Sequence, residues 1–585
     1  MRDPPGEITA TVRDPCSLLA RFVYPPGNRG YTVRASLPGR IGPLEVRNRI
    51  VMAPMISNLA QETGATDEAH IAYLAARARG GTGLVITEYT YVDGLNSRGS
   101  RNELGAHRED FVPKLRRLTE AIHEAGSLVF LQLVHAGGKA GWNTNPQAPM
   151  APSALDYGGH HPREMTAEDL DQVVESFRRA ARVGALSNFD GLEIHAAHAY
   201  LLHEFLSPAL NRREDRYGGS FENRLRLVQE VLQAVRREAG LPLGIRLSLY
   251  EDEADGYPPE YGVQVAERLE GLDYVHFSAG RFAPPGSSAS FGYPALHILR
   301  RLPRRPALPT MVVGSVLDGN GVEEVLEKVD FVSVGRAMLA DPNFAWKVMH
   351  DPEGLRPCIR CNQACRDLRW GEVRCTVNPD TGHEAECPPR RPITGPIAIV
   401  GGGVKGLEAA LQASLAGASV TLYEAREALG GQLLDLPEGA KRSEFLRLVR
   451  YYETVLRRRG VSFRLKTRYD GDAVDCRPDR TYESLLARRP SEVDSPIYQH
   501  LDEALELARE QKVTITEGSL SALDPVRAHA FREEAVRRGI TFHAGSPSPE
   551  AFSCGGQRQY DIRQAILAGR RALDEYLRGR DGLPS

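Results

Sequence analysis

Short strand-like runs alternate with longer amphipathic helical segments between residues 45 and 340, and this alternation limits the fold more than any other feature. Eight runs rich in β-branched and apolar residues are candidate strands: 49–54, 83–90, 127–135, 190–197, 244–249, 274–279, 310–316 and 331–336. Helical stretches lie between them, including 110–125, 167–187, 221–239 and 321–328. Eight strand–helix units in roughly 300 residues favour an α/β fold of the (β/α)8 TIM barrel type over an open doubly wound sheet.

Composition and charge exclude several classes of protein. The formal net charge of −3 gives no electrostatic reason to expect nucleic acid or a membrane surface as a partner. No apolar run reaches the roughly 18 residues of a membrane-spanning helix, and the first residues lack the apolar core of a signal peptide. Clustered cysteines without a secretion signal fit a reducing compartment, so we expect a cytoplasmic protein. The sequence does not indicate an oligomeric state.

Half of the eight cysteines lie within an 18-residue stretch: Cys358, Cys361, Cys365 and Cys375. The spacing Cys-x2-Cys-x3-Cys-x9-Cys supplies four thiolates, which can hold either an iron–sulfur cluster or a structural zinc ion, and spacing alone favours neither. The stretch joins two segments that each read as a nucleotide-binding module. An iron–sulfur centre in that place would relay electrons, so redox chemistry is the first functional hypothesis.

A second α/β unit follows the cysteines. Its candidate elements are a strand, a helix and a second strand at 397–403, 407–415 and 419–424. Gly401, Gly403 and Gly406 form the pattern G-x-G-x-x-G between strand and helix, and Glu424 ends the next strand. Such glycines let the helix N-terminus face a pyrophosphate, and the acid can bind ribose hydroxyls. The combination predicts a Rossmann-like module.

The fourth candidate strand of the barrel ends in an unusual polar group. His195 leaves the strand, and His198 and Tyr200 stand on the turn beyond it. Two imidazoles three residues apart can converge on one oxygen, while a nearby phenol can deliver a proton. The alternative is that these are merely polar loop residues, and spacing alone does not decide between the two.

Glycines close the seventh and eighth candidate strands. Gly314 and Gly335 stand at positions where barrels commonly bind phosphate through backbone N–H groups, and Arg336 adds a cation suited to bidentate contact. Glycines can also simply end strands, but two such positions on neighbouring strands favour a phosphate site.

Four segments together resemble the old yellow enzyme family of FMN-binding TIM barrels: VMAPM at 51–55, Gln132 within FLQLVH, the His195/His198/Tyr200 group, and NRREDRYGGSFENR at 211–224. The resemblance implies that Ala53, Pro54 and Met55 contact the isoalloxazine ring, that Gln132 binds its pyrimidine edge, and that Arg246 lies near N1–C2=O. It also implies that His195 and His198 hold a substrate carbonyl oxygen and that Tyr200 protonates the α-carbon. Ile56 replaces a flavin-bonding Thr or Cys of relatives, and Ser57 is the nearest hydroxyl that could substitute.

The cysteine stretch resembles the [4Fe–4S] segment of larger relatives, 2,4-dienoyl-CoA reductase and trimethylamine dehydrogenase, which favours a cluster over zinc. Residues 430–432 resemble the FAD-binding half of the same enzymes. The second glycine fingerprint that marks their NADPH unit is missing after residue 432, and Gly545-Ser546 stands where they carry Gly-Asp. We therefore expect a shortened, truncated Rossmann-like module that binds FAD, another adenine nucleotide, or nothing.

These observations give four expected parts: an irregular arm (1–36), an FMN-binding barrel (37–350), a four-cysteine iron–sulfur segment (351–392) and the Rossmann-like module (393–585). The expected reaction is reduction of an activated C=C bond in an enone, enoate or enoyl-thioester, with NAD(P)H as electron donor. One alternative is a dehydrogenase that passes electrons through the cluster to an external redox carrier. The other is amine dehydrogenation, as in trimethylamine dehydrogenase, which carries tyrosine where His195 stands.

Overall fold

The computed structural model describes residues 34–141, 144–157, 161–281, 294–363, 365, 366, 368, 371–386, 391–477, 492–494, 504, 507, 508, 510–516, 531, 532, 535–544, 552, 553 and 562–581. The predictions for residues 1–33 and for Gly545-Ser546 lie outside this set. No helix in the described set has both the length and the apolar character that a membrane crossing requires.

Eight parallel strands form the closed barrel that the sequence predicts. They are β3 (Ile50–Met52), β4 (Leu84–Ile86), β6 (Leu128–Val134), β9 (Gly191–Ala196), β10 (Leu243–Ser248), β11 (Tyr274–Ser278), β12 (Thr310–Val313) and β13 (Phe331–Val334). Pairing of β13 with β3, and of β4 with both β3 and β6, closes the ring. The runs are short and almost wholly buried, as expected for strands covered by helices on the outside and side chains on the inside.

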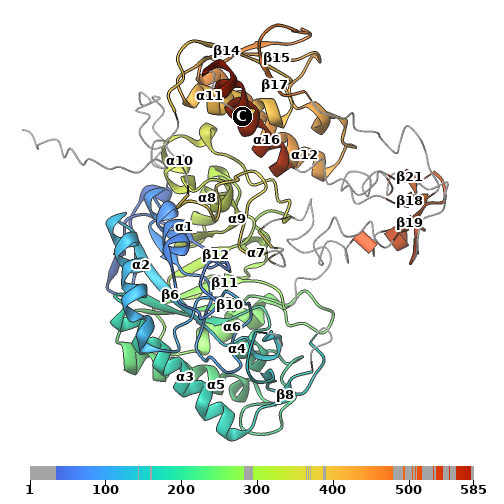
Figure 1. Ribbon diagram of the computed structural model, residues 1–585. Helices are drawn as coiled ribbons and strands as arrows, with labels where there is room; N and C mark the ends of the chain where they lie inside the picture. The colour runs from blue at the N-terminus through green and yellow to red at the C-terminus, as the bar shows by residue number, and fades with distance from the viewer. Residues whose placement is uncertain are drawn as a thin grey trace, which may run out of the picture.

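Helices surround the barrel (Figure 1). They are α1 (Glu68–Arg79), α2 (Val112–Glu124), α3 (Ala167–Leu186), α4 (Leu201–Leu206), α5 (Phe221–Ala239), α6 (Pro259–Arg268), α7 (His297–Arg301), α8 (Gly319–Leu326), α9 (Arg336–Ala340) and α10 (Phe344–His350). Local sequence sets the ends of the longest ones. Thr166 and Asp169 form a capping box at the start of α3, and Ser220 caps α5, which ends at Gly240 in the left-handed region (φ 64°).

The floor of the barrel is apolar and closed. A hairpin of β1 (Gly39–Ile41) and β2 (Leu44–Val46) supplies Ile41 and Val46 to a core cluster inside the ring. The cluster also contains Val51, Leu84, Ile86, Phe130, Tyr274, Met311 and Phe331. Since this end is filled with side chains, only the opposite end, at the strand carboxyl termini, is left for a ligand.

A second parallel sheet has the strand order β16–β15–β14–β17. Its strands are β14 (Pro396–Val400), β15 (Ser419–Tyr423), β16 (Ser462–Arg464) and β17 (Val474–Asp475), and its helices are α11 (Val404–Leu415), α12 (Ala440–Arg458) and α16 (Ile562–Asp581). Figure 1 shows these helices at one end of the barrel, and residues of both parts share one continuous apolar core. This is the Rossmann-like arrangement expected from the glycine pattern.

A small four-stranded parallel sheet is inserted between β17 and α16. Its order is β20–β19–β18–β21, with strands Thr541–His543, Thr514–Thr516, Glu492–Asp494 and Phe552–Ser553. Seven residues make a separate core: Val493, Ala504, Leu507, Val513, Ile515, Ala535 and Ile540. No strand is identified in this region from the sequence, because strands of two or three residues are too short to show an alternation of apolar and polar residues.

Candidate active site

The residues expected to contact the flavin ring follow β3 at the open end of the barrel. Ala53 is buried, and its N–H donates to Val334 O at 3.0 Å, which holds the 53–55 segment against the end of β13. A Cβ placed on Gly335 would lie 2.8 Å from Met55 Sδ. The candidate ring-binding segment and a candidate phosphate-binding glycine are therefore immediate neighbours.

A buried polar layer lies inside the barrel above the apolar floor. Glu193 on β9 accepts hydrogen bonds from Gln132 Nε2 at 2.6 Å and Tyr274 O–H at 2.9 Å, and it lies 3.0 Å from His276 Nδ1. Burial alone would raise the pKa of Glu193, but His276 and Arg246 outweigh it and lower that pKa. A charged carboxylate therefore belongs to this layer. Sequence reasoning missed it, although Glu193 stands two residues before His195 and so on the same face of the strand.

Arg246 on β10 is the cation of the same layer. Burial lowers its pKa to about 10, so the guanidinium stays charged at neutral pH. Its Nη2 lies 3.5 Å from Ser278 Oγ, whereas Nε and Nη1 have no hydrogen-bond partner among the described residues. Buried donors of this kind are costly unless a ligand accepts from them. They fit the electron-rich N1–C2=O edge of a flavin, the group implied for this position.

The structure brings His195, His198 and Tyr200 together. The ring centroids of His195 and Tyr200 are 4.8 Å apart at 84°, and those of the two histidines are 5.2 Å apart. His195 Nε2 and His198 Nδ1 lie 3.3 Å apart, and His198 Nε2 lies 2.7 Å from Ser278 Oγ. Ser278 therefore orients His198 so that its Nδ1 faces His195, and convergence of the two imidazoles on one substrate oxygen stays a prediction.

Both imidazoles are neutral donors or acceptors rather than cations. Burial, followed by the positive charge of Arg246, holds the pKa of His195 and of His198 well below the usual range. Burial also raises the pKa of Tyr200 to about 12, so its hydroxyl keeps its proton at neutral pH. The group can therefore bind an oxygen atom by neutral hydrogen bonds and offer one phenolic proton.

Ser57, the hydroxyl nearest in sequence to Ile56, is bonded to a buried carboxyl group in this structure. Its N–H donates to Glu88 Oε2 at 2.6 Å, and its hydroxyl donates to the same oxygen. Glu88, at the end of β4, also accepts from Leu104 N–H at 3.0 Å, and burial raises its pKa to about 7. Sequence reasoning missed this acid, whose signal was a carboxylate inside an otherwise apolar run.

The candidate phosphate site lies where β12 and β13 end. Gly314 has φ 124°, a left-handed region that favours glycine, and a Cβ there would meet Ile298 Cδ1 at 2.9 Å. Arg336, the first residue of α9, donates to Ser315 Oγ at 3.3 Å and to Asn362 Oδ1. The two glycines and the arginine are therefore close together, and Arg336 links them to the cysteine segment.

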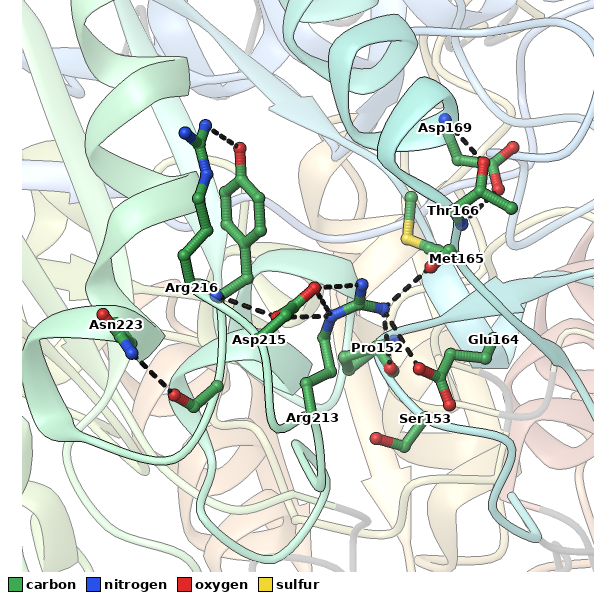
Figure 2. Close-up of polar contacts among 12 residues, drawn as sticks. Pro152, Ser153, Glu164, Met165, Thr166, Asp169, Arg213, Asp215, Arg216 and Asn223 are labelled. Atoms are coloured by element: carbon green, nitrogen blue, oxygen red, sulfur yellow. Dashed lines mark hydrogen bonds and ion pairs between the residues drawn. The ribbon is translucent and has the colours of Figure 1, made fainter.

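Residues 211–224 run through a loop into the first turn of α5, and their polar side chains contact neighbouring segments (Figure 2). Arg213, whose side chain is 7% exposed, donates to Pro152 O at 3.2 Å and Met165 O at 2.8 Å and pairs with Asp215 at 2.6 Å. Asn223 Nδ2 donates to Gly218 O at 3.0 Å. The contacts of Arg213 with Pro152 and Met165 join the loop that follows β6 to the segment that follows α4.

The four cysteines lie in one buried segment between the barrel and the Rossmann-like module. Burial raises the pKa of Cys375, and the thiols of Cys361, Cys365 and Cys358 raise it further, so all four are near one another. Arg360 N–H donates to Cys358 Sγ at 3.4 Å. Clustered soft thiols with an N–H···S contact fit an iron–sulfur cluster, although across the described chain no three His, Cys, Asp or Glu side chains are disposed as ligands of one metal ion.

This cysteine segment (residues 358–386) is attached on both sides. Toward the barrel, Val373 N–H donates to Ser57 O at 2.7 Å. Toward the module, Arg360 Nε donates to Glu444 Oε1 on α12 at 3.0 Å. The thiols therefore lie between the loop that follows β3 and the Rossmann-like module.

The glycine turn of the module has the geometry that its pattern predicts. A Cβ on Gly406 would collide with Gly401 O, and Gly401 has φ 106°, while Gly403 precedes the first residue of α11. Glu424 accepts from Gly402 N–H at 2.6 Å and from Arg426 N–H at 2.7 Å. Glu424 is the residue expected to bind ribose, and both of its carboxylate oxygens thus contact backbone amides in this structure.

Comparison with known proteins agrees with these features. A family model described as NADH:flavin oxidoreductase / NADH oxidase matches residues 37–353, and a model of the NAD(P)-binding Rossmann-like domain matches residues 399–445. The chain is 34% identical to an NADH oxidase of Thermoanaerobacter brockii over 74% of this chain and 70% of that protein. It is 31% identical to a cinnamate reductase of Clostridium sporogenes over 73% and 70%.

A solved complex of 2-naphthoyl-CoA reductase with 2-naphthoyl-CoA has the same overall fold, with a TM-score of 0.80 at 22% identity over 92% of this chain and 99% of that one. The family model covers more than half of the chain, and its matched segment coincides with the barrel that carries the polar group described above. The chain therefore belongs to the NADH:flavin oxidoreductase / NADH oxidase family.

Proposed function

We propose that this flavin-family oxidoreductase reduces the C=C bond of an α,β-unsaturated carbonyl compound. The observation that carries the proposal is the neutral imidazole pair of His195 and His198 beside the protonated phenol of Tyr200. Neutral imidazoles suit a carbonyl oxygen, since they donate hydrogen bonds without requiring an anionic ligand. The family relationship to a cinnamate reductase supports the same reaction class.

FMN is the proposed cofactor, and when bound it would supply the hydride to the β-carbon. Ala53, Pro54 and Met55 would contact its ring, and Gln132 its pyrimidine edge. Arg246 would pair with N1–C2=O, where its two unpartnered donors favour the electron-rich, reduced state. The phosphate would lie on Gly314, Gly335 and Arg336.

The protein's own residues would then polarise the substrate and move one proton. His195 and His198 would hold the carbonyl oxygen in place of the contact that joins His195 Nε2 to His198 Nδ1. These hydrogen bonds would draw electron density away from the β-carbon. The Tyr200 hydroxyl transfers its proton to the α-carbon, since a phenol with a high pKa is an acid only toward a strongly basic carbanion. The three side chains thus divide the work into binding and proton transfer.

The four cysteines, Cys358, Cys361, Cys365 and Cys375, are proposed to hold a [4Fe–4S] cluster. Three of them are buried and Cys365 is partly exposed. Their mutual proximity and their position between the barrel and the module support this role. NAD(P)H is the proposed electron donor to the flavin, and an external redox carrier is the alternative route through the cluster. Gly401, Gly403, Gly406 and Glu424 are proposed to bind FAD or another adenine nucleotide.

Anaerobic half-reactions test the proposal. Reduction of the bound flavin by NADH or NADPH is followed at the flavin absorbance, and the reduced protein is then mixed with cinnamate or 2-cyclohexenone. As a contrast, protein with oxidised flavin is mixed with a secondary amine. We expect an enone or enoate to reoxidise the flavin in wild-type protein and Tyr200→Phe to lose that step while it keeps flavin reduction. Tyr576→Phe on α16, a phenol far along the chain from the barrel, is the matched control. Reduction of oxidised flavin by the amine would contradict the assignment.

Cofactor analysis tests the cluster. Protein purified anaerobically should contain iron and acid-labile sulfide in equal amounts, and Cys361→Ser should lose both. Zinc in place of iron would overturn this part of the proposal.

A further inference from the structure

The backbone N–H of Ala197 fixes the position of the proton on His195. It donates to His195 Nδ1 at 3.2 Å, so Nδ1 is an acceptor and carries no hydrogen. His195 is neutral, because burial and then the charge of Arg246 hold its pKa well below the usual range. A neutral imidazole has one ring proton, and in His195 that proton therefore lies on Nε2, the nitrogen that faces His198.

The position of the proton on His198 follows from that on His195. His195 Nε2 and His198 Nδ1 lie 3.3 Å apart, and since His195 donates across this distance, His198 Nδ1 accepts. Burial and the charge of Arg246 also keep the pKa of His198 low, so its single proton lies on Nε2. That nitrogen lies 2.7 Å from Ser278 Oγ and donates to it. The hydrogen bonds thus run in one direction, from His195 through His198 to Ser278.

This arrangement opposes the binding of one carbonyl oxygen by both imidazoles. An oxygen that takes the place of the contact between the two rings meets the N–H of His195 but the lone pair of His198 Nδ1. Two acceptors that face each other form no hydrogen bond and repel. His198 can therefore donate to the oxygen only after its proton has passed from Nε2 to Nδ1.

The main chain of His198 is held on both sides. Its φ of 61° lies in the left-handed region, which is uncommon for a residue with a side chain. Its N–H donates to Ser248 Oγ at 3.1 Å, and its carbonyl oxygen accepts from Lys139 Nζ at 2.9 Å. Because these contacts fix the backbone and Ser278 binds the far nitrogen of the ring, a change of tautomer requires less movement than a change of ring position.

The Ser278 hydroxyl can bond either tautomer of His198. A hydroxyl accepts through its oxygen and donates through its hydrogen, so it pairs with Nε2 whether or not that nitrogen carries the proton. Arg246 Nη2 lies 3.5 Å from the same oxygen and can only donate. When Nε2 accepts, donation runs from Arg246 through Ser278 and His198 to the bound oxygen, and successive hydrogen bonds of this kind strengthen one another.

We propose that Ser278 is a positioning residue that lets His198 change tautomer when a carbonyl or phenolate oxygen binds. The Nε2–H bond of His198 breaks and an Nδ1–H bond forms, and the proton lost and the proton gained are both exchanged with water at the open end of the barrel. Ser278 changes from acceptor to donor at Nε2. The ring keeps one proton throughout, no electrons move, and both imidazoles then donate to the bound oxygen.

The role of this switch in turnover rests on the proposed alkene reduction, because a carbonyl oxygen that accepts from two imidazoles is polarised more strongly than one that accepts from a single ring. The change of tautomer itself can be measured without turnover. A suitable probe is 4-cyanophenol, whose phenolate oxygen accepts hydrogen bonds at mildly alkaline pH and which has no alkene to be reduced.

Nitrogen NMR of flavin-loaded protein with isotope-labelled histidine reports the tautomers, because protonated and unprotonated ring nitrogens resonate far apart. The signals are assigned by their loss in His195→Asn and His198→Asn. Free wild-type protein should carry the ring protons on Nε2 of both residues. Saturating 4-cyanophenol should move the His198 proton to Nδ1 and leave the His195 proton in place.

Variants of Ser278 separate this role from a structural one. Ser278→Ala lacks the hydroxyl that donates to Nε2, so the His198 proton should stay on Nε2 and 4-cyanophenol should bind roughly 10-fold more weakly. Reoxidation of the reduced protein by 2-cyclohexenone should slow by a similar factor. Ser278→Thr keeps a hydroxyl and should restore the affinity and the change of tautomer. Ser187→Ala, which removes a buried hydroxyl from the end of α3, is the control expected to match wild type.

Four results would overturn the switch: a His198 proton on Nδ1 in the free protein, an unchanged tautomer with the phenolate bound, no binding of the phenolate to wild type, or wild-type affinity in Ser278→Ala. Wild-type protein that changes tautomer but does not reduce 2-cyclohexenone would support the switch and contradict the proposed alkene reduction. The two proposals therefore fail by different measurements.

Discussion

The ion pair between Arg360 and Glu444 joins the cysteine segment to helix α12, and neutralising the acid should loosen that joint. The two side chains are 7% and 11% exposed, and Glu444 also accepts from Arg447 at 3.1 Å. Removing one partner of a buried pair costs about 3 to 5 kcal/mol, because it leaves the other charge desolvated and unpaired. Since these groups retain slight exposure, we expect Glu444→Gln to lose about 3 kcal/mol, or roughly a 150-fold rise in the opened population.

Hydrogen exchange of α12 and of the amides around Arg360 measures that population, and urea unfolding measures the loss of stability. Glu453→Gln on the same helix is the matched control, because its pair with Arg457 is 40% and 58% exposed and should contribute at most about 0.5 kcal/mol. A double-mutant cycle with Arg360→Met should recover a coupling energy of more than about 1 kcal/mol. If both glutamine variants shift equally, the pair does not hold the joint and the reasoning is refuted.

Three further predictions concern the barrel. Gly335→Val should lower FMN retention, measured as flavin per chain, because its Cβ would lie 2.8 Å from Met55 Sδ and its methyl groups would enter the proposed phosphate site. Full occupancy would contradict that site. Arg246→Gln should make the flavin midpoint potential more negative by about 30 to 60 mV, measured by dye equilibration, since it removes a charged donor worth roughly 1.5 to 3 kcal/mol. The free energy of unfolding should fall by about 3 kcal/mol as pH rises from about 4.5 through 7, because the native state holds the Glu88 proton more tightly than the unfolded state does. In urea titrations, Glu88→Gln should flatten this pH dependence.

The barrel could be predicted because its eight strands are buried apolar runs separated by long helical segments, and both signals survive in sequence alone. The two hairpin strands Gly39–Ile41 and Leu44–Val46 and the small sheet at residues 492–553 were not recognised. Strands of two or three residues are too short to show an alternation of apolar and polar residues. Their pairing also depends on contacts with distant parts of the chain.

Some residues of the candidate site can likewise be found from the sequence, and others cannot. His195 and Tyr200 stand close together in the sequence, so their motif shows them. Tyr89 lies beside Tyr200, with ring centroids 5.2 Å apart, only because β4 and β9 end at the same rim of a closed barrel. The spacing of residues along the chain does not predict such a contact. A carboxylate inside a buried apolar run, as at Glu88, is by contrast a signal that can be read from the sequence.

The attachment of the cysteine segment on both sides sets the range of motion between the two halves of the molecule. Val373 is hydrogen-bonded to the loop after β3, and Arg360 is hydrogen-bonded to α12. The thiols therefore do not lie on a flexible linker. The distance between the thiols and the rim of the barrel is therefore set by folding and does not change during each catalytic turnover. With the proposed cluster bound, electron transfer across this distance would be insensitive to solvent viscosity, unlike transfer that waits for a domain to rotate.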